Sequence, residues 1–277
     1  MAKLLYVTNS LEEQERFSLK KVYRSARRVG ASKGLAQKIV GIISREAYPG
    51  IATSEIFDRI NSLLYQKQPQ AALRFNLKKA MKRLGPSGFP FEKFAAKILA
   101  SSGFEIQLNQ YIQGYCCLYE TDVLAKKGNI LYLVECKYRN QPGGIVHLNN
   151  VLANQAKFLD ILKGGHCKKV KLRSLLVTNS KFTDQAIKYS QCVGMELLGW
   201  SYPRKNGLEH IIDRENLYPI TVLPSLKPYL ADVFVSNNIM LVKDLLGLDI
   251  NRFLKETGIS IRQLRPLMEE AKILIES

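Results

Sequence analysis

Three charged side chains stand close together in an otherwise apolar stretch of the sequence. Asp122 precedes a short run of mostly apolar residues, and Glu135 and Lys137 end a second apolar run that follows the pair Gly128-Asn129. Charges in such a setting are unfavourable for folding, because a buried charge costs free energy unless it is paired. Carboxylate oxygens are the ligands that Mg²⁺ prefers, and a lysine beside them offsets the charge of a phosphate. The segment is therefore a candidate site for metal-dependent chemistry at a phosphate.

The pair Gly128-Asn129 predicts how these residues are brought together. Both residues tolerate the positive φ angles of a two-residue hairpin turn, which would place Asp122 directly across from Glu135. A turn one residue earlier, or a four-residue loop, would instead place Glu120 opposite Glu135 and Asp122 on the diagonal. In either register the acids share one face of the hairpin, because side chains alternate along a strand.

The second strand of this hairpin is apolar on both faces until Glu135. Such a strand is typical of the covered centre of a sheet, so its terminal charges occupy a partly desolvated place. The simpler interpretation is a hairpin end whose charges reach solvent. Opposed carboxylates there are costly unless they are neutralised, which favours a functional site.

The spacing of Asp122 and the Glu135-x-Lys137 motif resembles the PD-(D/E)xK nuclease core, in particular its Mrr-like restriction-endonuclease branch. The flanking pattern resembles that branch over about residues 86–202. Its expected elements are a helix opened by Phe91-Glu92 and ended by Gly103-Phe104, a helix over 148–163, a strand over 172–178, a helix capped by Thr183, and a last strand over 196–198.

The resemblance implies a metal site and its ligands. Asp122 and Glu135 would bind Mg²⁺ or Mn²⁺, helped by the backbone carbonyl of Cys136, and Glu92 matches a helix acid that completes the site in many relatives. Lys137 would orient or activate the attacking water.

Two further features of the resemblance concern neighbouring positions. Gln155 lies where some relatives place a glutamine in the following helix, and we count it among the candidate catalytic residues. The proline that usually precedes the first acid is absent, with Thr121 in its place. Glu120 is therefore left as a ligand, a neighbour of the ligands or a solvated residue.

The charge of the chain favours a polyanionic partner. It has 41 Lys+Arg against 24 Asp+Glu, a net charge of +17. Residues 1–84 carry +11, residues 85–200 carry +6 and residues 201–277 are neutral, by counting along the sequence. An excess of cations binds DNA phosphates through counterion release, although a soluble basic surface is the simpler alternative. We expect the DNA contacts in the first 200 residues.

Residues 1–84 are predicted to form a mostly helical domain of their own. Its expected elements are a strand at 3–7, a helix ending toward Gly30, a helix over 33–48, a helix capped by Thr53 and a helix over 70–84. The order resembles an ATP-cone through Phe17-x-x-x-Lys21-Val22, Ile51-x-Thr53-x-Glu55-Ile56 and Ala72-Leu73-Arg74-Phe75.

The ATP-cone resemblance implies binding of ATP or dATP, with Lys20, Lys21 and Arg24 as phosphate contacts. The basic pair usual after the first strand is replaced by Thr8-Asn9. A basic helical domain that contacts DNA directly is the alternative.

Breaks in the pattern predict three regions. The glycines and prolines of 85–90 end the first at Leu84, and Ser201-Tyr202-Pro203 ends the second. Residues 203–277 are predicted to form a small helical module that resembles a helix-hairpin-helix. Apolar residues recur at helical spacing in this region. Helix packing or homo-oligomer formation would explain that pattern as well as DNA binding would. The predicted fold class is multidomain α/β, with an ATP-cone-like helical domain, a restriction-endonuclease-like core on a mixed sheet and a helical C-terminal module.

The remaining composition suggests an intracellular setting. No segment is apolar over the length needed to cross a membrane, and five cysteines without paired spacing indicate a reducing compartment, so we expect a cytoplasmic protein. The predicted function is a metal-dependent DNA endonuclease for restriction or DNA processing, regulated by ATP or dATP. The alternatives are a catalytically inactive DNA-binding or nucleotide-responsive regulator on a nuclease-like scaffold, and an interaction protein assembled through its helical tail.

Overall fold

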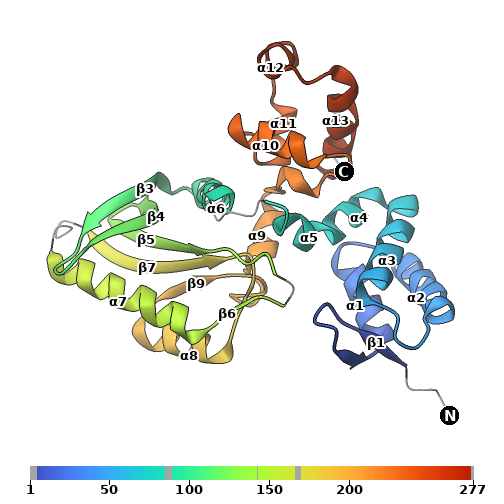
Figure 1. Cartoon of the computed structure of the whole chain (residues 1–277), viewed down its shortest axis with the longest axis horizontal. Helices are drawn as coiled ribbons and strands as arrows, with labels where there is room; N and C mark the ends of the chain where they lie inside the picture. Colours follow the sequence, from blue (N-terminus) through green and yellow to red (C-terminus); the bar gives the residue numbers. More distant parts are fainter. Residues whose placement is uncertain (1–4, 85–88, 142, 166–169, 276–277) are drawn as a thin grey trace. The chain divides into compact units, whose positions relative to one another are not determined.

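The computed structural model describes residues 5–84, 89–141, 143–165 and 170–275 (Figure 1). They divide into two compact units. One is Met81–Pro219, and the other combines Met1–Ala80 with Ile220–Ser277. Within the described ranges, no helix has both the length and the apolar character that a membrane span requires.

This division differs from the three regions predicted from sequence. The C-terminal residues pack with the N-terminal helices: the Gln70 side chain donates to the Leu274 carbonyl at 3.2 Å, and Thr221 donates to the Ala80 carbonyl at 2.9 Å. The predicted boundary at Tyr202 falls inside the central unit, because the Leu208 amide returns to the Gly199 carbonyl at 2.9 Å. The predicted Gly/Pro boundary lies largely at residues 85–88, outside the described residues.

The central unit is built on a five-stranded mixed sheet in the order β3-β4-β5-β7-β9. The strands β3, β4 and β5 are antiparallel neighbours, whereas β5, β7 and β9 run parallel. Its elements are α6 (Phe89–Ser101), β3 (Glu105–Gln113), β4 (Leu118–Lys127), β5 (Ile130–Lys137), β6 (Ile145–Val146), α7 (Leu148–Gly164), β7 (Lys171–Thr178), β8 (Lys181–Phe182), α8 (Asp184–Val193), β9 (Glu196–Leu198) and α9 (Leu208–Arg214).

Helices cover both faces of this sheet. Figure 1 shows α6 on one face and α7 with α8 on the other. The inward side chains of α6 are apolar and buried, among them Phe91, Phe94 and Ile98. Val151 and Ile161 of α7 are buried as well. Both faces of β5 are therefore covered by helices, as its two-sided apolar pattern predicts. The helix α8 begins after Thr183, whose hydroxyl accepts from the Ala186 amide as an N-cap.

The other unit is mostly helical. Its N-terminal elements are β1 (Tyr6–Thr8), β2 (Gln14–Arg16), α1 (Leu19–Arg28), α2 (Lys33–Glu46), α3 (Thr53–Lys67), α4 (Pro69–Phe75) and α5 (Leu77–Met81), the last residue of which belongs to the central unit. Its C-terminal elements are η1 (Ile220–Val222), α10 (Pro228–Ser236), α11 (Val242–Leu246), α12 (Ile250–Thr257) and α13 (Ile261–Ile275).

Two local predictions for the N-terminal helices are wrong. Thr53 is the first residue of α3 rather than its cap: the cap is Ala52, which makes no side-chain hydrogen bond. The single helix predicted over 70–84 is divided into α4 and α5 at Asn76. The Asn76 amide donates to the carbonyls of both Ala72 and Leu73, a bond pattern that tightens the last turn of α4.

The end of α7 packs directly on the turn between β3 and β4. A Cβ atom at Gly164 would lie 2.8 Å from the Gly114 carbonyl carbon and 2.9 Å from the Tyr115 nitrogen. Beside this contact, the Asp160 carboxylate accepts from the amides of Cys116 and Cys117. The absence of a side chain at Gly164 therefore sets how closely α7 approaches the sheet.

Gly164→Ala should lower the free energy of unfolding of the central unit by about 1–3 kcal/mol, because the added methyl group overpacks a backbone contact. Denaturation followed by the fluorescence of Trp200 reports on this unit, since Trp200 is the only tryptophan in the chain and is buried there. The matched control is Leu162→Ala, at a side chain 51% exposed on the same helix, which should change stability by less than about 0.5 kcal/mol. Equal effects of the two changes would contradict this role of Gly164.

Candidate active site

The hairpin of β4 and β5 has the register in which Asp122 and Glu135 are opposed. Lys127 pairs with Ile130 across Gly128-Asn129, and the pairing continues to Val123 opposite Val134. Gly128 has φ of 59°, as a two-residue turn of this kind requires. The alternative register, with Glu120 opposite Glu135, is excluded.

The two strands part at Asp122. The paired residues end at Val123 and Val134, and the amide of Cys136 donates to the Asp122 carboxylate at 2.6 Å. A side chain thus takes the place of a backbone acceptor on the neighbouring strand. The carboxylate of Asp122 is held between β4 and β5 by the backbone itself, and its position is determined by the sheet.

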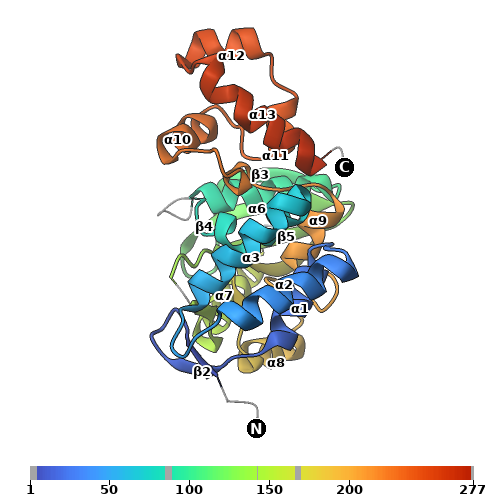
Figure 2. The same cartoon turned by 90° about the vertical axis from the view of Figure 1, so that its right-hand side faces the viewer.

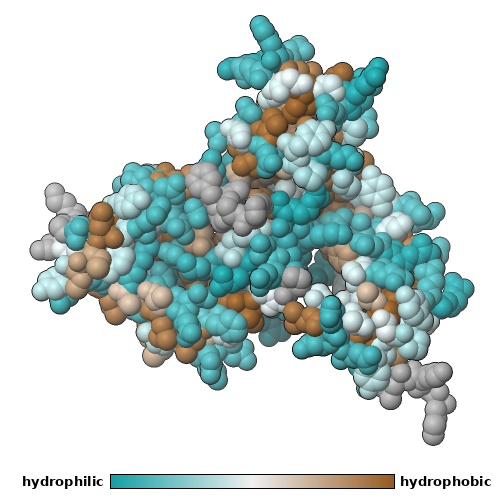
Figure 3. Space-filling model, in the orientation of Figure 1, coloured by the Kyte–Doolittle hydropathy of each residue, from teal (hydrophilic) through white to brown (hydrophobic). Residues whose placement is uncertain are grey.

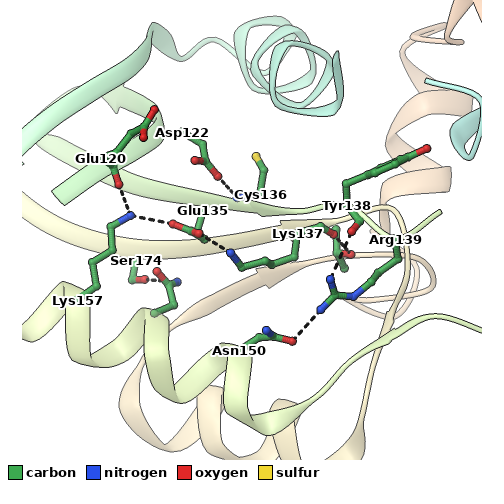
Figure 4. Close-up of polar contacts among 12 residues, drawn as sticks. Glu120, Asp122, Glu135, Cys136, Lys137, Tyr138, Arg139, Asn150, Lys157 and Ser174 are labelled. Atoms are coloured by element: carbon green, nitrogen blue, oxygen red, sulfur yellow. Dashed lines mark hydrogen bonds and ion pairs between the residues drawn. The ribbon is translucent and has the colours of Figure 1, made fainter. Parts of the chain in front are cut away.

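Glu135 lies between two lysines (Figure 4). Its Oε1 accepts from Lys137 Nζ at 2.6 Å and its Oε2 from Lys157 Nζ at 2.8 Å. The side chains of Glu135 and Lys157 are each 17% exposed, and that of Lys137 is 32% exposed. One carboxylate therefore has a cation on each oxygen in a largely desolvated place.

Glu120 contributes to this arrangement through its backbone. Lys157 Nζ donates to the Glu120 carbonyl as well as to Glu135, so one ammonium group joins α7, β4 and β5. The side chain of Glu120 is exposed, and Figure 4 shows its carbonyl rather than its carboxylate facing Lys157.

Burial and mutual repulsion act on the other acids. Desolvation and the charge of Glu135 raise the pKa of Asp122 above its ordinary value, despite the hydrogen bond from Cys136. Desolvation, followed by the charges of Asp122, Glu120 and Glu135, likewise raises the pKa of Glu92 on α6. The predicted acid Glu92 is thus electrostatically part of the same cluster. These carboxylates favour an added cation.

The pKa of Glu135 moves in the opposite direction. Burial works to raise it, but the hydrogen bonds and charges of Lys137 and Lys157 outweigh burial and hold the pKa below its ordinary value. Glu135 is therefore an anion at neutral pH, whereas burial and neighbouring acids disfavour the charged forms of Asp122 and Glu92.

Cys136 takes part through its backbone rather than its thiol. Its side chain is buried, and desolvation together with Asp122 and Glu92 raises the pKa of the thiol well above the ordinary range. The thiol is therefore no nucleophile at neutral pH. The predicted metal contact of the Cys136 carbonyl stays a prediction.

The sequence predicts Gln155 as the residue of α7 that belongs to the site, and it gives no prediction for Lys157. Gln155 is buried on α7, and the side chain that α7 brings to Glu135 is that of Lys157. A signal was present: Asn150, Asn154 and Lys157 recur at helical spacing along one side of α7. Each faces a polar group of the sheet layer, namely Arg139, Ser174 and Glu135 respectively. Gln155 keeps only the status of a sequence-based prediction.

The end of β5 is fixed by a second set of bonds beyond Lys137. The Arg139 amide donates to the Asn179 side chain at 2.8 Å, and Asn179 donates back to the Arg139 carbonyl at 2.9 Å. The hydroxyl of Thr178 donates to the Lys137 carbonyl. These contacts hold the backbone of the motif against β7.

The donor set suits a hard divalent cation with few protein ligands. In the described parts of the chain, no three His, Cys, Asp or Glu side chains converge closely enough to hold a metal ion. Mg²⁺ typically keeps several waters and takes one or two carboxylates, and Asp122 and Glu135 are the predicted pair. The raised pKa values of Asp122 and Glu92 are the expected sign of acids that a cation would stabilise.

Comparison with known proteins agrees with this fold. The Mrr-type catalytic domain, described as a restriction endonuclease, matches residues 85–199. The domain described as "AF1548-like, C-terminal" matches residues 218–275. A restriction-endonuclease-like core on a mixed sheet is therefore the class of the central unit. The predicted ATP-cone is not among the domains that these two matches identify.

A relative and a solved structure extend these matches. An uncharacterized protein of Archaeoglobus fulgidus is 36% identical over 180 residues, which are 65% of this chain and 99% of the relative. The crystal structure of a protein of unknown function, AF1548, has 33% sequence identity and a TM-score of 0.59, covering 69% of this chain and all of that one. The chain belongs to the AF1548-like family.

Lys157→Gln should lower the free energy of unfolding at pH 7 by about 1–3 kcal/mol, the cost of leaving a charged acceptor with one partner fewer. Because Glu135 has a lowered pKa, the stability that its ion pairs supply is present above the unfolded-state pKa of about 4.3 and is lost as pH falls through the folded value. The difference between variant and wild type should therefore shrink toward pH 3, as measured by Trp200 fluorescence.

The control for this variant is Lys188→Gln, which removes one charge from an exposed position on α8. It should change stability by less than about 0.5 kcal/mol at either pH. A loss in Lys157→Gln that is the same at pH 3 and pH 7 would contradict an electrostatic role.

Proposed function

We propose that the protein is a metal-dependent endonuclease that hydrolyses phosphodiester bonds of DNA. The observation that carries this proposal is the Asp122–Glu135–Lys137 arrangement at the point where β4 and β5 part, within a domain that matches restriction endonucleases. The Cys136 amide holds the Asp122 carboxylate, and the ammonium groups of Lys137 and Lys157 hold that of Glu135, which supports a rigid site. Rigid placement is what catalysis of phosphoryl transfer requires.

The roles of the residues follow from their positions. Asp122 and Glu135 would hold Mg²⁺ or Mn²⁺, with Glu92 as the further acid beside them. When bound, such an ion stabilises developing negative charge at the phosphate and lowers the pKa of a coordinated water. Lys137, hydrogen-bonded to Glu135 and partly exposed, would orient the attacking water and offset the phosphate charge. Lys157 would keep Glu135 ionised and in place.

An inactive DNA-binding or nucleotide-responsive regulator on the same scaffold is the alternative. It has no need for Asp122 and Glu92, whose charges are costly in the folded protein. Their presence beside Lys137 favours the enzyme. Restriction and DNA processing both fit a basic endonuclease, so the assay below includes unbranched and branched DNA.

Purified protein with Mg²⁺ or Mn²⁺ should cleave plasmid or branched DNA, with and without ATP, as measured by gel electrophoresis. Asp122→Asn and Lys137→Ala should each lower the rate by about 100-fold or more. Asp122→Asn should remain folded, because it removes a charge that burial disfavours while it keeps an acceptor for the Cys136 amide.

Lys188→Gln, on the exposed side of α8, is the control and should cleave as the wild type does. The catalytic assignment is overturned if the wild type cleaves none of these substrates, or if cleavage survives in both variants.

We also propose that the N-terminal helices bind ATP or dATP. A pocket there is lined by several residues of the ATP-cone-like motifs, among them Phe17, Lys21, Val22, Thr53, Ile56 and Phe75. An apolar wall with aromatic rings suits a base, and Lys21 with Arg16 and Ser18 suits phosphates. Lys20 and Arg24, the other two predicted phosphate contacts, do not line this pocket.

Saturating ATP or dATP should raise the melting temperature of the wild type, since a ligand of the folded state adds about 2.7 kcal/mol at 100 times its dissociation constant. Lys21→Gln should lose most of this increase, whereas Lys20→Gln should keep it. Unchanged melting of the wild type with both nucleotides would count against the pocket. Equal loss in the two variants would count against the role of Lys21.

A further inference from the structure

The surface of α1 and α2 is a strongly basic feature that the candidate site leaves unexplained. From Arg16 to Arg45 the sequence has nine basic residues and no Asp or Glu. Most of these cations lie on the two helices, which pack on each other through buried apolar residues such as Val22, Ala26 and Ile39. Figure 2 shows α1 and α2 side by side.

Three of the cations form one row on α1. Lys20, Arg24 and Arg28 recur every four residues, and all three are exposed. Successive members are therefore about 6 Å apart along the helix axis, and the row spans about 12 Å. Each strand of duplex DNA carries a phosphate every 3.4 Å or so of helix axis, so the row covers roughly three to four phosphates.

This row has no acid to neutralise it. None of the ion pairs or hydrogen bonds of the described residues involves the side chain of Lys20, Arg24 or Arg28. Other exposed cations of the chain do have acidic partners, as Arg59 has in Glu46 and Arg252 in Glu256. Like charges at helical spacing destabilise a helix, so the row has a cost that folding does not explain.

The exposed side of α2 gives a second indication. Gly34 and Gly41 lie within the helix, and an added Cβ at either would meet nothing within 4 Å. Glycine in a helix costs up to about 1 kcal/mol relative to alanine, and packing inside the protein does not require it here. The two glycines alternate with the exposed cations Lys38 and Arg45 at helical spacing, which leaves the backbone open to close approach beside positive charge.

Hydrophilic side chains along the outer edge of α2 continue this surface in Figure 3. We propose that the exposed faces of α1 and α2 form a binding surface for the phosphate backbone of duplex DNA, with Lys20, Arg24 and Arg28 as its main contacts. Charge complementarity selects a polyanion, and the regular row suits a duplex better than a compact anion. The surface is distinct from the ATP pocket, which takes Lys21, and its contacts carry no base sequence information.

The test is the triple variant Lys20→Gln, Arg24→Gln and Arg28→Gln in the full chain. Binding to a fluorescein-labelled 30-base-pair duplex is measured by anisotropy in EDTA at several salt concentrations, so that cleavage does not contribute. The triple should weaken binding by about 10-fold or more at 0.15 M salt. It should also reduce the slope of log K against log salt by roughly 2–3, since each phosphate contact contributes about 0.9.

The matched control removes the same charge from exposed positions of α12 and α13: Lys255→Gln, Arg262→Gln and Arg265→Gln. It should change affinity by less than about 2-fold. Equal losses in the two triples would show that net charge alone matters and would overturn the proposal. It is also overturned if the wild type does not bind the duplex, or if the α1 triple loses only its response to ATP.

An RNA duplex of the same sequence is the remaining comparison. Preferential binding of RNA by the wild type, lost in the α1 triple, would overturn the assignment to DNA. The proposal does not depend on catalysis. A wild-type protein that binds the duplex but cleaves no DNA would count against the endonuclease and leave this surface supported.

Discussion

The ion pairs of Glu135 are the interaction on which the candidate site depends. A carboxylate that is largely removed from water needs compensation, and Lys137 and Lys157 supply it from opposite oxygens. Lys157 also binds the Glu120 carbonyl, so the same ammonium group that neutralises β5 holds β4 at the point where the strands part. Lys157 can neutralise Glu135 and hold β4 only if α7 lies at the right place on the sheet.

The placement of α7 connects that constraint to the rest of the central unit. Gly164 lets the helix end approach the β3–β4 turn, and Asp160 binds the amides of that turn. At the other end of the site, Asn179 and Thr178 of the β7 end bind the backbone of Lys137 and Arg139. Asp122 and Glu92, whose pKa values are raised by burial and neighbouring acids, lie where the metal ion is proposed. Burial disfavours the charges of these acids at the position where chemistry is proposed.

Sequence predicts what is local in this structure and misses what depends on distant elements. The turn at Gly128-Asn129 and the cap at Thr183 were readable because few residues decide each. The sequence allows two registers for the hairpin of β4 and β5, and only the structure shows which of them is present. The edge strand β3 was missed although its side chains alternate between exposed and half-buried, and Lys157 was missed because its partner Glu135 is 22 residues away. The return of the C-terminal helices to Gln70 and Ala80 has no local signal at all.

The parallel pairing of β5 with β7 has a consequence for the order of folding. The hairpin of β4 and β5 closes over two residues, whereas β7 joins only after α7 has crossed the sheet. Short loop closures are fast and crossover connections are slow. Asp122 and Glu135 should therefore meet early, with Lys137 already on the hairpin but before Lys157 arrives on α7 to complete the charge compensation of Glu135. In a folding experiment the acids would oppose the nascent hairpin until the helix docks, so refolding should be faster at a pH that protonates them.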